Sequence, residues 1–197
     1  MNDNSPQLLP PFDFSVPEDA SVASEIGILK ASDADMGANA DLSFSIFGNS
    51  TEFIINQTGS LTIRRQLDRE KTSGYSLNYR VSDKGTPPRM TSGVLKIDVV
   101  DVNDNNPVFD SSEYNCSVSE NAPSPAVVCF VSATDIDEGS NAEISYSIEG
   151  VSTSFKIDEV RSIFSKLWTM NSDIGVQNSL KLSPSTSILS LLCWDDI

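Results

Sequence analysis

The sequence predicts an all-β protein, a seven-strand Greek-key β-sandwich of the immunoglobulin-like kind followed by a second, truncated copy of the same unit. Three observations predict this fold. Short segments alternate apolar and polar residues, turn residues separate them, and the sequence repeats itself after about 100 residues. The 197 residues suffice for two domains of ordinary size, and a hydrophobic content of 39% supports a packed core.

The predicted strands of the first unit follow from period-2 alternation. Apolar side chains occupy every second position in five segments, at 12–16, 42–46, 61–63, 75–81 and 94–100. No stretch of the first unit sustains the 3.6-residue apolar period of a helix. About seven short strands in about 100 residues are typical of a two-sheet sandwich.

The repeat is read from acidic and turn residues at a constant offset. Glu18 corresponds to Glu120, an offset of 102, and the same offset relates Asp33 to Asp135 and Asp35 to Asp137. At the beginning of the chain, Asn2-Asp3-Asn4 matches Asn103-Asp104-Asn105 with an offset of 101. A period of this length indicates a domain repeat rather than a solenoid turn.

The repeat divides the chain into four predicted parts. Residues 1–5 end a preceding inter-repeat linker, residues 6–107 form a complete repeat, residues 108–159 form the amino-terminal half of a second repeat, and residues 160–197 form an aberrant or divergent tail. In the tail, the counterparts of Leu67-Asp68-Arg69-Glu70 are Thr169-Met170-Asn171-Ser172, and Ser185 replaces Asp83. A foreign sequence joined to half a repeat and a genuine divergent repeat both remain open.

Composition excludes several classes of function. The net charge of −15 disfavours nucleic acid as a partner, because phosphate binding requires clustered Lys and Arg. Histidine is absent, which excludes Ser-His-Asp and Cys-His catalytic arrangements. The amino terminus lacks the pattern of a signal peptide, and the apolar run at 188–194 is too short to span a membrane.

Acidic and amide side chains cluster at predicted strand ends and connections. Carboxylates and carbonyl oxygens are the ligands that Ca²⁺ prefers, so these clusters predict calcium binding. An EF-hand is excluded, because a loop that starts at Asp33 has Phe44 where the twelfth position needs Glu. A glycosidase that uses paired carboxylates is a weaker alternative, since no aromatic residues accompany the acids to line a pocket.

Together, SVPEDA, DAD…AN, LDRE, SDKGTPP and DVNDNNPVF resemble, in this order, the signature of the cadherin extracellular repeat over residues 2–158. The resemblance implies that three calcium ions lie between successive repeats. It assigns to the first ion Glu18, Asp68, Glu70 and Asp104. It assigns to the second ion Glu18, Glu70, Asp101, the carbonyl of Val102, Asp104 and Asp137. It assigns to the third ion Asn103, the carbonyl of Asn105, Asp135, Asp137 and the carbonyl of Asn141.

The third ion lacks one carboxylate, because the second repeat has no counterpart of Asp83. At the beginning of the chain, half of an earlier calcium joint is expected from Asn2, Asn4, Asp33, Asp35, Asn39 and Asp83. The joint centred on DVNDN still gathers seven carboxylates, which repel one another unless cations neutralise them. They are Glu18, Asp68, Glu70, Asp101, Asp104, Asp135 and Asp137. Calcium is therefore expected to stiffen the joint.

The resemblance implies a function without catalysis. The expected role is calcium-dependent cell–cell adhesion through homophilic contact with other cadherin ectodomains, on the extracellular side of the plasma membrane and in a parent protein that is membrane-anchored, as in a protocadherin or a large atypical cadherin. A mechanical spacer that contacts no partner is an alternative that the sequence does not separate from this role.

Two kinds of covalent modification fit an extracellular protein. Asn49, Asn56 and Asn115 each begin an Asn-X-Ser/Thr glycosylation sequon. Cys116 and Cys129 fall on inward positions of neighbouring predicted strands, where a disulfide and a pair of buried thiols are both open. In the first repeat, Phe14 and Gly27 occupy the matching positions.

Overall fold

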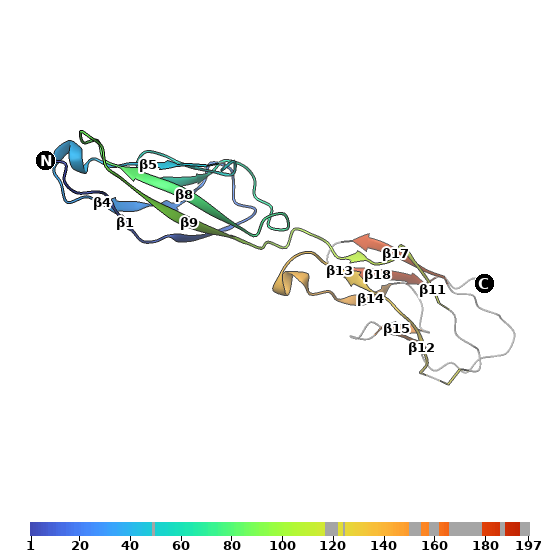
Figure 1. Ribbon diagram of the computed structural model, residues 1–197. Helices are drawn as coiled ribbons and strands as arrows, with labels where there is room; N and C mark the ends of the chain where they lie inside the picture. Colours follow the sequence, from blue (N-terminus) through green and yellow to red (C-terminus); the bar gives the residue numbers. More distant parts are fainter. Residues whose placement is uncertain are drawn as a thin grey trace. The chain divides into compact units, whose positions relative to one another are not determined.

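The structure is a computed structural model of the chain that forms two compact units, Met1–Val102 and Asn103–Ile197 (Figure 1). It describes residues 1–48, 50–116, 122–123, 125–149, 155–157, 162–165, 179–185 and 188–193. The predicted boundaries at residues 107 and 159, and the aberrant nature of the tail, stay predictions.

The first unit consists of two facing sheets and a short strand pair. One sheet has four strands in the order β2 (Asp13–Pro17), β9 (Met90–Val100), β8 (Gly74–Ser82) and β5 (Ser43–Ile46). The other has three, in the order β3 (Glu25–Ile28), β7 (Ser60–Ile63) and β6 (Phe53–Ile55). The pair joins β1 (Gln7–Leu9) to β4 (Lys30–Ser32).

The all-β prediction is confirmed, and the seven-strand count is recovered once interrupted strands are joined. Pro10 and Pro11 separate β1 from β2, because proline has no N–H to donate to a ladder. Leu29 separates β3 from β4 and is itself buried, with 2% of its surface exposed. Merging each of these two pairs leaves seven strands in the first unit.

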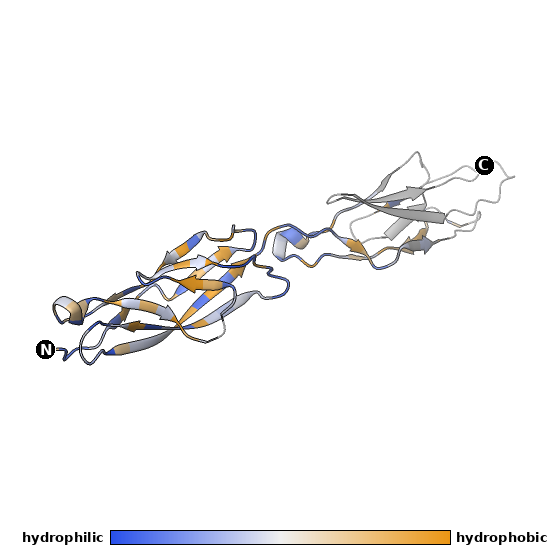
Figure 2. Ribbon diagram, turned by 90° about the horizontal axis from the view of Figure 1, so that it is seen from above, coloured by the Kyte–Doolittle hydropathy of each residue, from blue (hydrophilic) through white to orange (hydrophobic). Residues whose placement is uncertain are grey.

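Alternation along β8 and β9 builds the core of the first unit. Tyr79, Val81, Leu95 and Ile97 have no exposed surface, whereas the residues between them are exposed or partly exposed. Figure 2 shows hydrophobic and hydrophilic residues alternating along strands of the first unit. Burial of these apolar side chains is the main contribution to the stability of a sandwich of this size. The alternation predicted from sequence at 75–81 and 94–100 is therefore confirmed.

The parallel pairing of β2 with β9 determines where the acidic residues lie. Pro17 pairs with Val100 at the end of this ladder, and the N–H of Glu18 donates a hydrogen bond to the carbonyl of Val100 at 3.1 Å. Because parallel strands end at the same edge of a sheet, Glu18 and Asp101 leave the sandwich side by side.

The second unit repeats part of this arrangement. A short pair joins β10 (Val108–Phe109) to β13 (Ala133–Thr134), and a three-strand sheet has the order β12 (Val127–Phe130), β16 (Ser162–Ser165), β15 (Phe155–Ile157). The four-strand sheet has the order β11 (Glu113–Asn115), β17 (Ser179–Ser185), β18 (Ile188–Cys193), β14 (Tyr146–Glu149).

The final hairpin of the second unit enters its sheet in the opposite order to that of the first. In the first unit the later strand, β9, pairs with β2, and that pairing is parallel. In the second unit the earlier strand, β17, pairs with β11 in antiparallel fashion, and β18 pairs with β14 in parallel. The hairpin of β17 and β18 therefore departs from the repeat in topology, whereas β16 takes the place that β7 has in the first unit.

Among the described residues, helical structure is confined to two 3₁₀ turns of four residues each, η1 (Gly37–Ala40) and η2 (Gly139–Ala142). They occupy equivalent places in the two units and carry Asn39 and Asn141. Neither approaches the length needed to span a membrane.

The two units tie their first two long strands together by different means. In the second unit, Cys116 and Cys129 form a disulfide, with their Cα atoms 5.8 Å apart. In the first unit the ring of Phe14 covers Gly27, so that a Cβ on this glycine would lie 2.2 Å from Cε1 of Phe14. A packed ring therefore takes the place of the covalent bond, as the matching sequence positions suggest.

Gly27→Ala is expected to destabilise the first unit by about 1 to 3 kcal/mol, because the added methyl group overpacks the space that the ring fills. In a Phe14→Leu background the ring is gone, and the same substitution should cost much less. The four proteins to compare are the wild type, Gly27→Ala, Phe14→Leu and the double variant. Urea unfolding, monitored by hydrogen exchange in β8 and β9, measures their free energies of unfolding. An equal cost of Gly27→Ala in both backgrounds would contradict the assignment.

Candidate metal centre

Three carboxylates converge where the first unit ends. Glu18, Glu70 and Asp101 each offer an oxygen, and these oxygens lie within 4.8 Å of one another. Glu18 and Asp101 come from the ends of β2 and β9, whereas Glu70 comes from the turn between β7 and β8, which the buried Leu67 anchors to the core. Glu18 has only 2% of its surface exposed, so the group is partly withdrawn from water.

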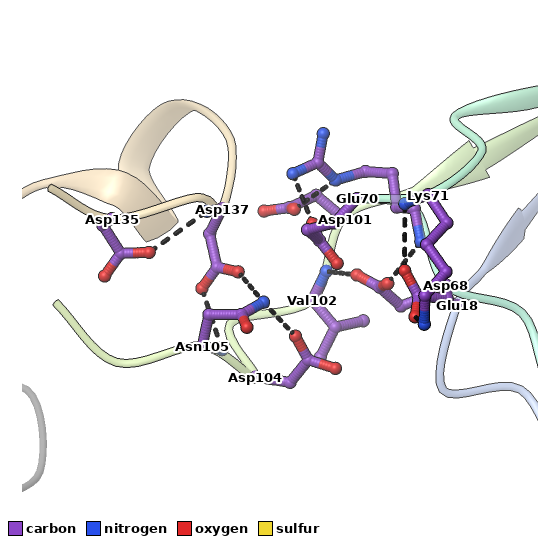
Figure 3. A network of polar contacts seen from close by, with 11 residues as sticks. Glu18, Asp68, Glu70, Lys71, Asp101, Val102, Asp104, Asn105, Asp135 and Asp137 are labelled. Atoms are coloured by element: carbon purple, nitrogen blue, oxygen red, sulfur yellow. Dashed lines mark hydrogen bonds and ion pairs between the residues drawn. The ribbon is translucent and has the colours of Figure 1, made fainter. Parts of the chain in front are cut away.

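Arg69 is the cation of this group. Its Nη2 lies 2.6 Å from Oε1 of Glu70, and its Nε lies 2.5 Å from Oδ1 of Asp101 (Figure 3). Its backbone N–H donates a hydrogen bond to Oε2 of Glu18 at 2.7 Å, and the N–H of Val102 donates to Oε1 of the same glutamate at 3.0 Å. One arginine thus contacts all three carboxylates, through its guanidinium group and its backbone.

The environments of the flanking acids differ. Loss of hydration is the main reason that the pKa of Glu70 is raised above its usual value, and the charge of Glu18 adds to it. Ionisation of Glu70 is therefore less favourable than in water. Asp68 is instead paired with Lys71 through both side chains, and the hydrogen bond from Lys71 is the main reason that the pKa of Asp68 is lowered. Asp68 is not one of the three converging carboxylates, although the sequence predicts it as a ligand of the first ion.

At the opposite end of the first unit, several buried oxygen atoms accept no hydrogen bond. Asp83 has 3% of its surface exposed, and its Oδ1 accepts hydrogen bonds from the N–H groups of Gly85 and Arg89, both at 3.0 Å, and from the side-chain amide of Asn2 at 3.2 Å. Its Oδ2 is buried without a hydrogen-bond donor, as are Oδ1 of Asn2 and Oδ2 of Asp33. A buried acceptor without a donor is an atom that a cation would satisfy.

A second motif at this end pairs an asparagine with an aspartate. Asn4 donates to Asp35 twice, from its backbone N–H at 3.1 Å and from its amide at 2.7 Å, and the amide bond is the main reason that the pKa of Asp35 is lowered. The N–H of Asp35 in turn donates to Oδ1 of Asp33 at 2.9 Å. This motif holds both carboxylates in fixed positions near the beginning of the chain.

The second unit contains the same motif. Asn105 donates to Asp137 from its backbone N–H at 3.3 Å and from its amide at 2.7 Å, and the N–H of Asp137 donates to Oδ1 of Asp135 at 3.1 Å (Figure 3). The amide of Asn105 also reaches Oδ1 of Asp104 at 2.8 Å, as that of Asn4 reaches Asp3 at 3.3 Å. The repeat read from the sequence is thus also a repeat of hydrogen-bond geometry.

The remaining predicted ligands are placed as follows. Asn39 lies in η1 with Oδ1 near Gly85, where a Cβ on that glycine would meet it at 2.8 Å. Asn141 occupies the equivalent place in η2, and Asn103 lies exposed directly after Val102. The counterpart of Asp83, Ser185, falls on β17. The ligand assignments themselves stay predictions.

Sequence reasoning missed the role of Arg69. It lies between Asp68 and Glu70 in the LDRE motif, and a basic residue inside an acidic motif was the available signal. The three predicted glycosylation sites differ in their structural settings. Asn56 is exposed, Asn115 lies in β11, and Asn49 falls outside the described residues.

Comparison with known proteins identifies the family. The family model of the cadherin domain matches residues 12–100, which span β2 to β9 of the first unit. The chain belongs to the cadherin superfamily. The matched residues include Glu18, Asp33, Asp35, Glu70 and Asp83 of the acidic motifs described above.

The similar proteins are cadherins and protocadherins. Protocadherin-11 X-linked of Sus scrofa is 40% identical over 160 residues, which are 80% of this chain and 14% of that protein. Cadherin-23 of Rattus norvegicus is 39% identical over 174 residues, covering 81% of this chain and 5% of that protein. The solved structure of mouse cadherin-23 EC22–24 matches with a TM-score of 0.80 at 29% identity, over 100% of this chain and 66% of that one. The chain thus spans a small part of its curated relatives.

The residues present fit the calcium ions that cadherin domains bind. Ca²⁺ takes six to eight oxygen ligands in a flexible geometry, and both ends of the first unit supply carboxylate and amide oxygens without an intervening histidine or cysteine. The buried oxygen atoms of Asn2, Asp33 and Asp83 that lack hydrogen-bond donors are of the type that Ca²⁺ prefers as ligands.

Arg69→Gln is expected to have opposite effects on stability without calcium and on calcium affinity. Without calcium, loss of the guanidinium leaves Glu70 and Asp101 without its charge and should cost about 1 to 3 kcal/mol. With calcium, removal of the positive charge that contacts two predicted ligands should strengthen binding about tenfold, because it removes the repulsion between the guanidinium and the ion. Thermal unfolding in chelator and calorimetric titration with calcium measure the two effects.

Arg64→Gln is the matched control. Arg64 is exposed and lies only five residues away, so the change of net charge is the same. If both substitutions alter calcium affinity equally, the effect comes from the overall field of the protein and not from the contacts of Arg69.

Proposed function

We propose that the chain is a calcium-binding segment of a cadherin ectodomain that supports homophilic cell–cell adhesion. The single observation that carries this proposal is the convergence of Glu18, Glu70 and Asp101 within 4.8 Å at the end of the first unit. Like charges this close oppose folding unless cations compensate them. The chain continues from these acids directly into the Asn103-Asp104-Asn105 motif, which adds further oxygen ligands within a few residues.

In the proposed mechanism, calcium rigidifies the joint between successive repeats. Without the ion, the acids at the end of one repeat and those at the beginning of the next repel one another. With the ion, ligands from both repeats bind the same charge and hold one relative geometry. Dissociation constants of about 10⁻⁴ to 10⁻³ M are typical of extracellular calcium modules, so the joint would be filled outside the cell and empty in the cytosol.

Localisation and partners follow from the relatives. Protocadherins and cadherins are plasma-membrane proteins with extracellular repeats, which supports an extracellular position for this segment. We propose other cadherin ectodomains as partners, through homophilic contact. The family consists of adhesion proteins and not of enzymes, which favours binding over carboxylate-based catalysis.

Asp101→Asn should reduce the stabilisation that calcium confers on the full chain. At 10 mM calcium, the dissociation constants given above predict about 1.4 to 2.7 kcal/mol of stabilisation for each occupied site. Thermal unfolding with calcium and with chelator, monitored by hydrogen exchange in β8 and β9, measures the stabilisation that calcium confers on the first unit. The variant should lose much of it.

Asp98→Asn is the control for this experiment. Asp98 lies on β9, which Asp101 directly follows; it is exposed and loses the same charge, but its side chain is not one of the three converging carboxylates. It should keep the full effect of calcium. A wild-type chain with the same stability in calcium and in chelator would falsify the proposal.

A further inference from the structure

We infer that Asn56 carries an N-linked oligosaccharide and that this glycan covers the exposed face of the β3–β7–β6 sheet. Asn56 begins the sequon Asn56-Gln57-Thr58 and directly follows the edge strand β6. The inference rests on the proposed extracellular role, since the modification requires synthesis in the secretory pathway. It also assigns a role to a surface that the calcium sites do not use.

The turn that carries Asn56 fixes the orientation of its amide. Oδ1 accepts three hydrogen bonds, from the N–H of Thr58 at 3.0 Å, the hydroxyl of Thr58 at 2.8 Å and the N–H of Ser60 at 3.0 Å. Two of these donors are backbone N–H groups, and an amide nitrogen in the same place could not accept hydrogen bonds from them. The oxygen must therefore face the turn, and the nitrogen must face away from it.

The nitrogen atom that would be modified is thus presented to solvent. Asn56 is exposed, and among the residues that the structure describes its Nδ2 donates no hydrogen bond. The turn is closed by a bond from the N–H of Gly59 to the carbonyl of Asn56 at 3.1 Å, and Gly59 has a positive φ of 91°. A substituent on Nδ2 would break none of these contacts, so the folded turn accommodates a glycan.

The same face of the sheet exposes two large aliphatic side chains. Ile28 on β3 is 48% exposed and Ile54 on β6 is 51% exposed. Ile28 pairs with Ser60 on β7, and the N–H of Asn56 donates to the carbonyl of Ser60, so Ile28, Ser60 and Asn56 form one row across the sheet. Neighbouring strands are about 4.8 Å apart, which places Asn56 about 10 Å from Ile28 and, two residues along the strand, about 7 Å from Ile54.

A glycan at Asn56 lies within reach of both isoleucines. It also stands beside β6, the edge strand of this sheet. Exposed apolar side chains are a liability for association, and a hydrophilic oligosaccharide is a means of covering them. The proposed glycan therefore closes this face of the first unit to protein contact.

The modification is a transfer of a glycosyl group from a lipid-linked oligosaccharide diphosphate. A bond forms between Nδ2 of Asn56 and the anomeric carbon of the first sugar, while the bond from that carbon to the diphosphate oxygen breaks. The lipid diphosphate leaves with the electron pair of the broken bond, and the proton that Nδ2 loses passes to the departing diphosphate or to water. No oxidation or reduction takes place.

The test uses the full chain, secreted from human cells behind a cleavable leader. Peptide mass spectrometry after glycosidase treatment should find Asn56 converted to Asp in the wild type and in Thr58→Ser, which keeps the hydroxyl group. It should find unmodified Asn56 in Thr58→Val, which removes the hydroxyl group at nearly constant shape. An unmodified Asn56 in the secreted wild type overturns the site.

Hydroxyl-radical footprinting of the same samples tests the covering. Ile28 and Ile54 should lose reactivity in the glycosylated wild type relative to Thr58→Val. Val94 on β9 of the other sheet, which is 53% exposed, is the internal control and should react equally in both. Equal reactivity of the two isoleucines in both proteins overturns the covering even where Asn56 is modified.

Calcium titration of the same chain separates this inference from the proposed function. A chain that binds calcium and leaves Asn56 unmodified contradicts the glycan alone. A chain that carries the glycan and binds no calcium contradicts the calcium joint alone.

Discussion

The parallel ladder between β2 and β9 is the constraint on which the acidic end of the first unit depends. Because both strands end at Pro17 and Val100, the residues that follow them must lie together. Those residues are Glu18 and Asp101, and the turn anchored by Leu67 adds Glu70. The three charges cannot move apart without breaking backbone hydrogen bonds or exposing the core. A nearby positive charge is therefore needed to offset their mutual repulsion.

Arg69 meets this requirement within the first unit, and the way it does so bears on calcium binding. Its guanidinium lies 2.5 Å from Asp101 and 2.6 Å from Glu70, two of the acids that the family resemblance assigns to calcium. A divalent ion that approaches these oxygens must share them with the arginine or displace it. Part of the binding energy is then spent on this competition, which is consistent with an affinity suited to the high calcium concentration outside cells.

Sequence alone predicted the fold class and the grouping of acids by place in the repeat, because both depend on local patterns. Alternation at 75–81 and 94–100 reports which side chains face the core, and that pattern matches the buried side of β8 and β9. The contacts of Arg69 and the pairing of Asp68 with Lys71 were not predictable in this way. They depend on side-chain directions in a turn, which spacing does not define. The bond between Cys116 and Cys129 was left open for a related reason, since alternation places both inward but gives no distance.

The two units also separate local from distant contributions to a calcium site. The motif of Asn4, Asp35 and Asp33 recurs as Asn105, Asp137 and Asp135 with nearly the same hydrogen bonds, although the later strands of the two units pair in different orders. Its asparagine precedes its two aspartates by about 30 residues, and the short strand pairs β1–β4 and β10–β13 bring them together, so the motif needs none of the later strands. Asp83, in contrast, reaches its place through the β8–β9 hairpin, and the hairpin of the second unit is the element that differs. In this chain, the beginning of each unit therefore places most of the predicted ligands by itself, and Asp83 depends on the hairpin that completes the sandwich.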